Sequence, residues 1–296
     1  MPMPTLEAVD APRPADEDRY RRVLEEGRIL FFPRTPFPLP DEDRAVLLRQ
    51  RQSGAGYHKN IAYRPAQDRV TGSASGADAE GLRRVLRDYS RSVVAFTASI
   101  LPTYAARWRV DFASFRPEEE AGRGLSLRSR NDLVHVDAFP TRPTRGDRIL
   151  RVFTNVNPEA PRVWRSGGTF EDLAARFASA SGLLDRARRA GAGGALRRLA
   201  RAVGLPVAAR SPYDRFMLSF HHFLKENRGF QDEGGKATLE FPAGSTWMVF
   251  TDMVSHAVLG GRYALEHTFI VSRGSLALPD KAPIAILEGI AGAPLG

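Results

Sequence analysis

The amino-acid sequence predicts an α+β protein with a mainly β core, a double-stranded β-helix of the jelly-roll or cupin-like type. Short segments of β-branched and aromatic residues, separated by Gly and Pro, follow one another after Trp108. Helical patterns dominate the chain before Trp108, and a helical insertion at about 169–230 interrupts the strands. Because many short strands with turn residues between them are typical of barrels and double-sheet folds, we expect the N-terminal helices and the insertion to buttress a jelly roll.

Charge and periodicity indicate helices in the N-terminal part. Residues 16–28 begin with acidic residues and form an expected helix, and a strand is expected at 29–33. Acidic residues also open an expected helix at 41–52. Apolar residues recur every three or four positions over 81–107, which predicts a long amphipathic helix.

Two segments of this part lack a regular pattern. Residues 1–15 are rich in Pro and acidic residues and are expected to be disordered, which leaves 16–296 as a single jelly-roll domain. Residues 54–72 are polar and aromatic, and this stretch is too long to be a minimal connection. Loops of this kind often carry function.

The chain after Trp108 supplies the predicted β core. Seven segments are expected as strands: 110–117, 124–130, 133–139, 148–156, 238–244, 245–259 and 262–272. Gly260 and Gly261 lie between the last two segments and predict a hairpin there. A capping-box pattern at Thr169 and Asp172 opens the helical insertion, and residues 213–231 indicate its last helix.

Composition limits the chemistry. The 296 residues include no Cys, which excludes disulfides, thiolate metal sites and a Cys nucleophile. Any metal must therefore be held by His, Asp or Glu. No apolar run reaches the roughly 20 residues that a membrane span requires. We expect a cytoplasmic protein, soluble or peripheral on the inner face of the inner membrane, and the sequence leaves homo-oligomer formation open.

The positive charge comes almost entirely from arginine. The net charge is +9, and the block at 181–210 holds seven Arg and one Asp. Arginine forks suit carboxylates and phosphates, so an anionic inner-membrane surface is one natural partner, although coding bias toward Arg explains the charge equally well. The block fits either a basic amphipathic surface helix or a merely solvated face. No nucleic acid partner is expected, because helix-turn-helix, RRM and KH signatures are absent.

The stretch NDLVHVDAFP, residues 131–140, places a histidine and an aspartate two positions apart in an apolar run. On a strand, residues two apart face the same side, so His135 and Asp137 can project into one pocket. They provide two of the three ligands of a 2-His-1-carboxylate Fe(II) site, which leaves three positions open. In this interpretation the protein needs no catalytic side chain beyond the metal ligands.

The third ligand should be a histidine far downstream. His256 is our choice because it precedes the predicted turn, as distal ligands commonly do in this enzyme class. His267 is expected to be a core or supporting residue. His221 and His222, on a predicted helix, are expected to be packing or surface residues.

An Fe(II) site of this type needs a second substrate that supplies electrons, usually 2-oxoglutarate, and O2. The far carboxylate of 2-oxoglutarate requires a buried cation, and only Arg offers a bidentate pair. Arg151 is the first candidate, because it interrupts an apolar strand where an unpaired charge would be costly. Arg262, at the start of the last strand, is the second.

Several long strings resemble the Kdo hydroxylase family. They are HVDAFPTRPTRGDRILRVFTNVNP, PRVWR, YDRFML, FTDMVSHAVLGGRYALEHTF and the earlier GYHKNIAYRP. The resemblance covers the chain from about residue 25 to 275. The Arg-rich block and the HHF string at 221–223 depart from the family pattern, so a substrate role at HHF stays open. The resemblance implies an Fe(II)/2-oxoglutarate dioxygenase with ascorbate as reductant. It would hydroxylate C3 of 3-deoxy-D-manno-oct-2-ulosonic acid (Kdo), in the lipopolysaccharide inner core of Gram-negative bacteria, to Ko.

The resemblance also implies that arginines line the approach of an acidic sugar attached to phosphorylated lipid A. The candidate substrate-binding residues are His58, Lys59, Asn60, Tyr63, Arg116, Arg128, Arg130 and Arg165. Asn155 and Trp164 are expected to shape the pocket wall. The basic block and the apolar C-terminal tail are expected to rest against anionic lipid.

Two other functions remain open from the sequence. One is a dioxygenase of the same fold that acts on another small or carbohydrate substrate. The other is a non-catalytic basic lipid-binding protein in which the HVD string is accidental polarity in the core. Loss of bound iron in a His135→Ala/Asp137→Ala variant would separate the enzyme from the binding protein.

Overall fold

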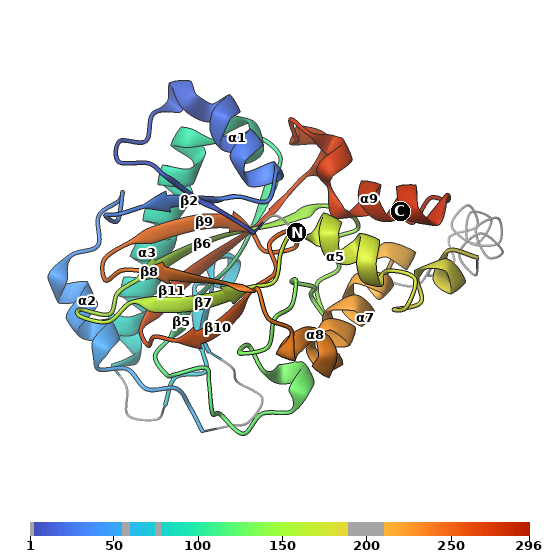
Figure 1. Cartoon of the computed structure of the whole chain (residues 1–296). Coiled ribbons are helices and arrows are strands. Elements are labelled where there is room, and N and C mark those ends of the chain that lie inside the picture. The colour runs from blue at the N-terminus through green and yellow to red at the C-terminus, as the bar shows by residue number, and fades with distance from the viewer. Residues whose placement is uncertain (1–2, 55–59, 75–77, 189–209) are drawn as a thin grey trace, which may run out of the picture.

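The computed structural model of the chain describes residues 3–54, 60–74, 78–188 and 210–296. Its strands form two sheets that lie one over the other (Figure 1). The large sheet has the order β1-β2-β9-β6-β11-β5-β3-β4, and the small sheet has the order β10-β7-β8. This arrangement confirms the predicted jelly roll with helices around it.

The strands of the large sheet come from both halves of the chain. Their bounds are β1 Leu6–Ala8, β2 Ile29–Phe32, β3 Ile61–Arg64, β4 Arg69–Thr71, β5 Trp108–Arg116, β6 Arg148–Asn155, β9 Thr246–Phe250 and β11 Ala264–Val271. The small sheet consists of β7 Arg162–Ser166, β8 Ala237–Phe241 and β10 Ala257–Gly260. Except for the parallel pair β1 and β2, the strand pairs are antiparallel.

Aromatic side chains fill the space between the two sheets. Trp164 of the small sheet contacts Phe153 and Trp247 of the large sheet edge-to-face, with ring centroids 5.0 and 5.5 Å apart. Phe241 stacks on Trp247 at 3.9 Å. All four rings are buried. Because aromatic residues bury large apolar areas, this cluster holds the two sheets together. Trp164 of β7, which belongs to the cluster, also lines a cavity.

Helices cover the outer face of the large sheet. α3 (Ala79–Ile100) starts at Asp78, whose carboxylate accepts a hydrogen bond from Gly81 N, and its apolar face is buried. α1 (Glu17–Glu25), α2 (Asp41–Leu48) and the short α4 (Pro102–Ala105) lie on the same side (Figure 1). The periodicity at 81–107 therefore predicted the helix correctly, and Pro102 begins a separate turn because proline has no N–H to continue the helix.

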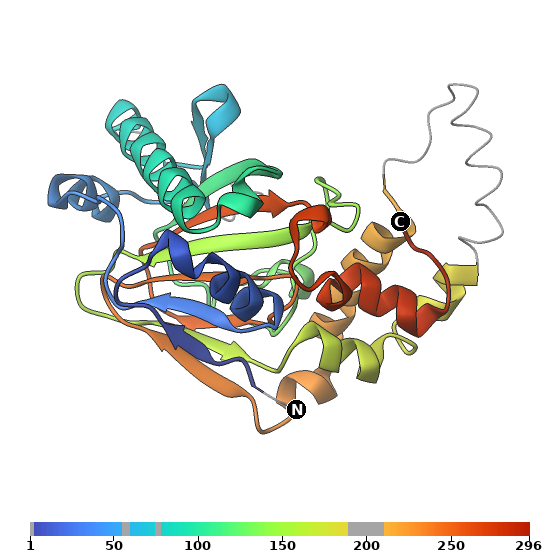
Figure 2. The same ribbon diagram turned by 90° about the horizontal axis from the view of Figure 1, so that it is seen from above.

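A second group of helices gathers at one end of the sheets (Figures 1 and 2). It comprises α5 (Phe170–Phe177), α7 (Pro212–Glu226), α8 (Arg228–Asp232) and α9 (Pro283–Ala291). Capping boxes start α5 at Thr169 and Asp172 and α7 at Ser211 and Asp214. α5, α7 and α8 fall in the insertion predicted at about 169–230, whereas α9 comes from the C-terminal part of the chain. Most of the Arg-rich block at 181–210 lies outside the described residues.

The C-terminal tail differs from its predicted role. Ile284, Leu287 and Leu295 are buried in the main core, and Leu295 O accepts a hydrogen bond from Tyr213 N of α7. Its apolar residues therefore pack inside the protein, and only Ile290 is exposed among its large side chains. Within the described ranges, no helix has both the length and the apolar character that crossing a bilayer needs.

Several expected elements were wrong. Residues 124–130 form no strand but only the 3-10 turn Leu127–Ser129, because Leu127 is exposed and no strand among the described residues pairs with this segment. Residues 1–15 include β1, which pairs with β2, so the predicted disorder does not hold there. Residues 54–72 contain β3 and β4. Residues 133–139 are extended but form only an isolated bridge at His135.

The predicted hairpin at Gly260 and Gly261 was also wrong. β10 pairs with β7 in the small sheet, whereas β11 pairs with β5 and β6 in the large sheet. The glycines therefore carry the chain from one sheet to the other. Gly261 has φ of 100°, and a Cβ there would lie 2.7 Å from Pro161 O, so the crossing requires glycine.

Candidate metal centre

The predicted ligands His135 and His256 lie side by side at the helical end of the sheets. Their backbones form an antiparallel bridge in which each residue donates to the other: His135 N to His256 O at 3.1 Å, and His256 N to His135 O at 2.8 Å. Asp137 is held in the same way, since its N donates to Thr251 O at 2.8 Å. Backbone pairing thus brings the two distant segments of the chain to one place.

Both imidazoles are oriented by the same local contact. Nδ1 of His135 lies 2.7 Å from Leu133 O, and Nδ1 of His256 lies 3.0 Å from Val254 O. A carbonyl oxygen can only accept, so each Nδ1 carries the proton and each Nε2 keeps its lone pair. Burial lowers the pKa of His135 to about 3 and also lowers the pKa of His256. Both rings are therefore neutral at pH 7, the form that binds metals.

The carboxylate of Asp137 lies between the two rings. Its Oδ1 is 3.6 Å from His135 Nε2, and its Oδ2 is 4.0 Å from His256 Nε2. Burial alone raises the pKa of Asp137, but the Arg151 guanidinium and the imidazoles lower it well below its usual value. Asp137 Oδ2 is buried and has no partner of hydrogen-bond geometry among the described residues. With metal–ligand bonds of about 2.1 Å, two ligand atoms of one ion can lie up to about 4.2 Å apart, so Asp137 can share a divalent cation with either imidazole.

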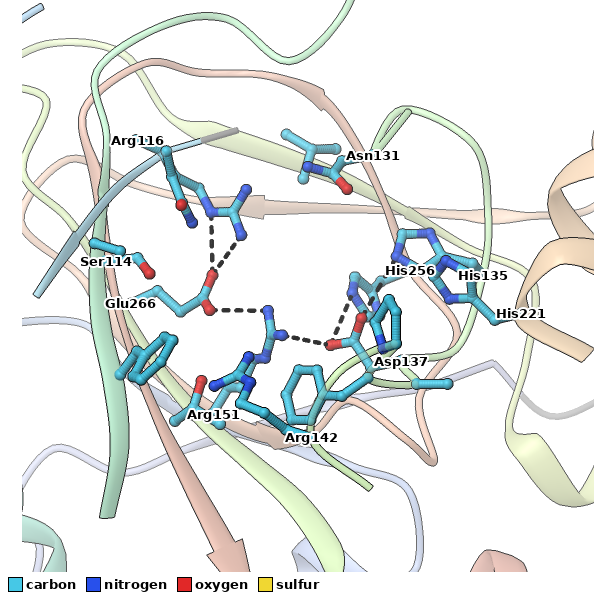
Figure 3. Close-up of a pocket in the computed structure, with 18 of the residues that line it drawn as sticks. Ser114, Arg116, Asn131, His135, Asp137, Arg142, Arg151, His221, His256 and Glu266 are labelled. Carbon is cyan, nitrogen blue, oxygen red and sulfur yellow. Dashed lines mark hydrogen bonds and ion pairs between the residues drawn. The ribbon is translucent and has the colours of Figure 1, made fainter. Parts of the chain in front are cut away.

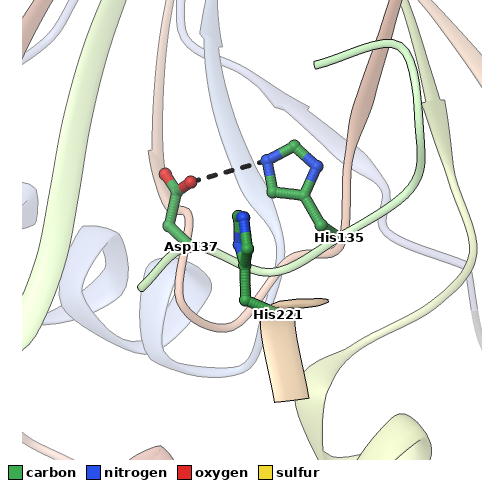
Figure 4. Close-up of side chains that lie close together, drawn as sticks. All are labelled: His135, Asp137 and His221. Atoms are coloured by element: carbon green, nitrogen blue, oxygen red, sulfur yellow. Dashed lines mark ion pairs between the residues drawn. The ribbon is translucent and has the colours of Figure 1, made fainter. Parts of the chain in front are cut away.

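A third imidazole reaches the same cluster from α7. The nearest ligand atoms of His135, Asp137 and His221 all lie within 4.8 Å of one another (Figure 4). Nδ1 of His221 lies 2.7 Å from Val136 O, and its ring meets the His135 ring edge-to-face at 4.7 Å. The expectation that His221 only packs or lies on the surface was wrong. A position in a predicted helix gave no sign that this helix packs beside the HVD string.

Arg151 connects Asp137 to a buried network of charges (Figure 3). Its Nη2 is 3.2 Å from Asp137 Oδ2, and its Nη1 is 2.9 Å from Glu266 Oε1. Arg116 binds the same Glu266 at 2.7 Å and Glu120 at 2.8 Å. Burial opposes ionisation of both carboxyls, yet the neighbouring guanidiniums lower the pKa of Glu266 and of Glu120. The predicted Arg151 therefore lies at the site.

Arg162 completes this network and was not predicted. It is buried, its Nη1 donates to Gly261 O, and its Nη2 lies 3.9 Å from Glu120. Burial lowers its pKa to about 10, and its Nε has no hydrogen-bond partner among the described residues. Residues 162 and 164 of β7 face inward, so strand alternation could have indicated Arg162 in place of Arg165, which is exposed.

The centre lies in a cavity of about 620 Å³ between the two sheets and α7. Trp164 forms part of its wall, as expected, and stacks on the His256 ring with centroids 4.9 Å apart. Asn155, the other expected wall residue, does not line the cavity and donates instead to Ala160 O and Phe241 O. Of the predicted substrate residues, Asn60, Arg116 and Arg128 line the cavity. His58 and Lys59 lie outside the described residues.

Other predicted residues lie elsewhere. Tyr63 is buried and donates to Asp68 at 2.9 Å, while Arg130 pairs with Asp132 at 2.6 Å. Arg262, the second choice for 2-oxoglutarate, donates to Pro117 O at 3.1 Å and does not line the cavity. His267 is buried against Ser90, 2.8 Å away, which agrees with its expected core role.

A jelly-roll core with two neutral imidazoles and a carboxylate at the end of a cavity is the architecture of a non-heme iron oxygenase. The profile of the family described as 3-deoxy-D-manno-oct-2-ulosonic acid (Kdo) hydroxylase matches residues 8–294. The chain therefore belongs to the Kdo hydroxylase family.

Solved structures agree with this assignment. A crystal structure of the Kdo hydroxylase KdoO, described as a non-heme Fe(II) alphaketoglutarate dependent dioxygenase in complex with alphaketoglutarate and Fe(III), has a TM-score of 0.79. Its apo structure has a TM-score of 0.80, and its cobalt(II) complex has 0.81. In each case the identity is 33%, over 98% of this chain and 97% of that chain. No curated protein matches the chain.

Proposed function

We propose that this member of the Kdo hydroxylase family uses Fe(II), 2-oxoglutarate and O2 to hydroxylate C3 of Kdo in Kdo-lipid A, which gives Ko. The observation that carries the proposal is the convergence of His135, Asp137 and His256 beside a buried cluster of arginines. Family membership and the printed description of KdoO support the substrate and the cofactors.

In this proposal His135, Asp137 and His256 are the iron ligands. Two neutral imidazoles and one carboxylate leave a +2 ion with a single positive charge in the site, which suits the binding of an anionic co-substrate. When bound, iron with 2-oxoglutarate and O2 supplies the oxidation that inserts one oxygen atom into a C–H bond. The chain's own residues have to position the substrates and exclude water.

The buried arginines are proposed to hold 2-oxoglutarate. The cluster contains three positive charges, on Arg116, Arg151 and Arg162, and two negative charges, on Glu120 and Glu266. Asp137 is left out of this balance because the proposal assigns it to the metal. One net positive charge in a buried site favours a carboxylate from outside the chain. Nε of Arg151 and Nε of Arg162 have no hydrogen-bond partner in the part of the chain that the structure describes, which supports the same assignment. Arg151 is the first choice, because its fork lies next to a metal ligand.

Coupling between the acceptor and the oxo-acid tests this function. Enzyme with Fe(II), 2-oxoglutarate and ascorbate should release succinate several times faster when Kdo-lipid A is added. The Asp137→Ala variant should show no such stimulation. If Kdo-lipid A changes nothing while the wild-type enzyme still turns over 2-oxoglutarate slowly, the dioxygenase acts on another substrate.

An anionic membrane surface is the proposed partner of the basic chain. The net charge of +9 and a lipid-linked acceptor both support attachment at the membrane surface. The buried C-terminal tail does not take part in this proposal. Flotation with anionic vesicles at low salt should carry the protein to the top fraction, and neutral vesicles should not. Equal recovery with both kinds of vesicle would remove the electrostatic attachment.

A further inference from the structure

Arginine and phenylalanine side chains alternate along one wall of the cavity. The guanidinium carbons of Arg64 and Arg142 lie 4.7 and 4.3 Å from the centroid of the Phe112 ring. Arg142 also lies 4.2 Å from the centroid of Phe139, and Arg151 lies 5.5 Å from the same ring. We call Arg64, Phe112, Arg142 and Phe139 the arginine ladder. Each of its members lines the cavity.

The arginine ladder lies next to the metal centre. Its inner ring, Phe139, contacts Arg151, whose Nη2 is 3.2 Å from Asp137. Figure 3 shows Arg142 next to Arg151, on the side of the pocket away from the three histidines. The outer member, Arg64, ends β3. A line of positive charge therefore extends from the metal ligands along the cavity wall, separate from Arg116 and Arg162.

The ladder holds more positive charge than its neighbours neutralise. Arg142 pairs through Nη1 with Asp111, which accounts for one cation. Nε of Arg64 is buried and has no hydrogen-bond partner among the described residues. The rings hold the guanidiniums in place through cation–π contact without neutralising them. Half-buried arginines kept apart by rings and facing a cavity are suited to the fork-like binding of an oxyanion.

We propose that Arg64 and Arg142 bind an oxyanion of the sugar acceptor and thereby select acidic acceptors over neutral ones. This inference rests on the proposed function and adds to it the residues that recognise the acceptor. The oxyanion is either the carboxylate of the sugar or a phosphate of the lipid to which it is attached. Phe112 acts as a positioning residue, because its ring contacts both guanidiniums.

Equilibrium binding without oxygen tests the arginine ladder. Under nitrogen, with iron and 2-oxoglutarate bound, the Kd of Kdo-lipid A should rise about tenfold or more in Arg142→Gln and in Arg64→Gln. That change corresponds to ~1.4 kcal/mol or more. The Kd of 2-oxoglutarate and the iron content should stay within about twofold. Arg69→Gln is the matched control, because Arg69 pairs with Arg64 across β3 and β4 but is exposed outside the cavity.

The same measurement with dephosphorylated Kdo-lipid A separates the two sources of the oxyanion. A loss of affinity that persists with this acceptor assigns the ladder to the sugar carboxylate, and a loss that disappears assigns it to a phosphate. Phe112→Leu should weaken acceptor binding with both arginines present. Unchanged Kd values for both acceptors in both arginine variants would overturn the proposal. A parallel loss of 2-oxoglutarate binding would also overturn it, because the ladder would then serve the oxo-acid.

This design keeps the two proposals apart. Acceptor binding is measured where no turnover can occur, so an enzyme that binds Kdo-lipid A through the ladder but does not hydroxylate it contradicts only the proposed function. An enzyme that hydroxylates Kdo-lipid A with unchanged Kd in the variants contradicts only the ladder. Thermal unfolding of each variant within a few degrees of the wild type shows that a lost affinity comes from the site.

Discussion

The backbones of His135 and His256 form two hydrogen bonds with each other. In each residue, Nδ1 of the imidazole also contacts the carbonyl oxygen of the residue two positions earlier. These contacts hold both rings in place without a bound metal. His221 reaches the same cluster from a helix, through contact with Val136 O. A backbone bridge holds His256, whereas a single contact from a helix holds His221, and we therefore expect the two residues to have different roles. Measuring metal binding in variants of each residue distinguishes these roles.

His256→Ala should abolish tight iron binding, because it removes one of the two Nε2 atoms that the backbone bridge holds beside Asp137. His221→Ala should keep at least half of the bound iron, since His135, Asp137 and His256 stay in place. Metal analysis after equilibration with a defined Fe(II) concentration measures both. Loss of iron in His221→Ala with retention in His256→Ala would make His221 the third ligand.

Arg151→Lys should weaken 2-oxoglutarate binding by about tenfold or more, because an ammonium cannot replace a fork that spans Asp137 and Glu266. Arg262→Lys should change the affinity less than twofold, since Arg262 donates to Pro117 O outside the cavity. Titration of the iron-loaded enzyme with 2-oxoglutarate under nitrogen gives both values. A larger effect at Arg262 would mean that the oxo-acid binds elsewhere.

Arg148 and Asp252 form a buried ion pair whose disruption should be costly. Nε and Nη2 of Arg148 lie 2.9 and 3.2 Å from the carboxylate, and its guanidinium lies 4.1 Å from the Phe250 centroid. Arg148→Met should lower the free energy of unfolding by about 3–5 kcal/mol, because it leaves a buried carboxylate without its partner. The Arg148→Met/Asp252→Leu variant should recover part of that loss. Urea unfolding tests this, and a double variant less stable than the single one would contradict it.

The buried His267 should make stability depend on pH. Burial lowers its pKa to about 4, against an ordinary value of 6.5. As pH falls from 6.5 toward 4, the unfolded chain takes up a proton that the folded chain refuses. The free energy of unfolding therefore decreases with falling pH, by up to ~1.4 kcal/mol per pH unit from this group. Above pH 6.5 this contribution is fully present.

The His267→Gln variant isolates this effect. Gln can still contact Ser90 but does not titrate, so its stability should fall less steeply between pH 6.5 and 4 than that of the wild type. Urea unfolding at several pH values measures the two slopes. The other buried histidines titrate in both proteins and cancel in the comparison. Identical slopes would show that His267 is not the buried neutral group described here.

The sequence predicted those parts of the site that depend on local alternation. His135 and Asp137 share a face because they are two residues apart, and Arg151 stood out as a charge in an apolar strand. The same argument applied to β7 would have found Arg162, which shares its face with Trp164. Arg165 was chosen there instead, and it points outward.

Contacts between distant segments could not be predicted in this way. Neither α7 nor the HVD string indicates by its own pattern that His221 lies beside Val136. The Gly260 and Gly261 pair has the composition of a hairpin, but the flanking strands belong to different sheets, β10 beside β7 and β11 beside β5. The arginine ladder likewise depends on β3, β5 and the loop after Asp137 meeting at one wall.

The mass of the product tests the central claim most directly. Kdo-lipid A incubated with the enzyme, Fe(II), 2-oxoglutarate and ascorbate under isotopically labelled O2 should gain one labelled oxygen atom, and fragmentation should place it on the Kdo ring at C3. An acceptor of unchanged mass, with iron and 2-oxoglutarate both bound to the enzyme, would contradict the account.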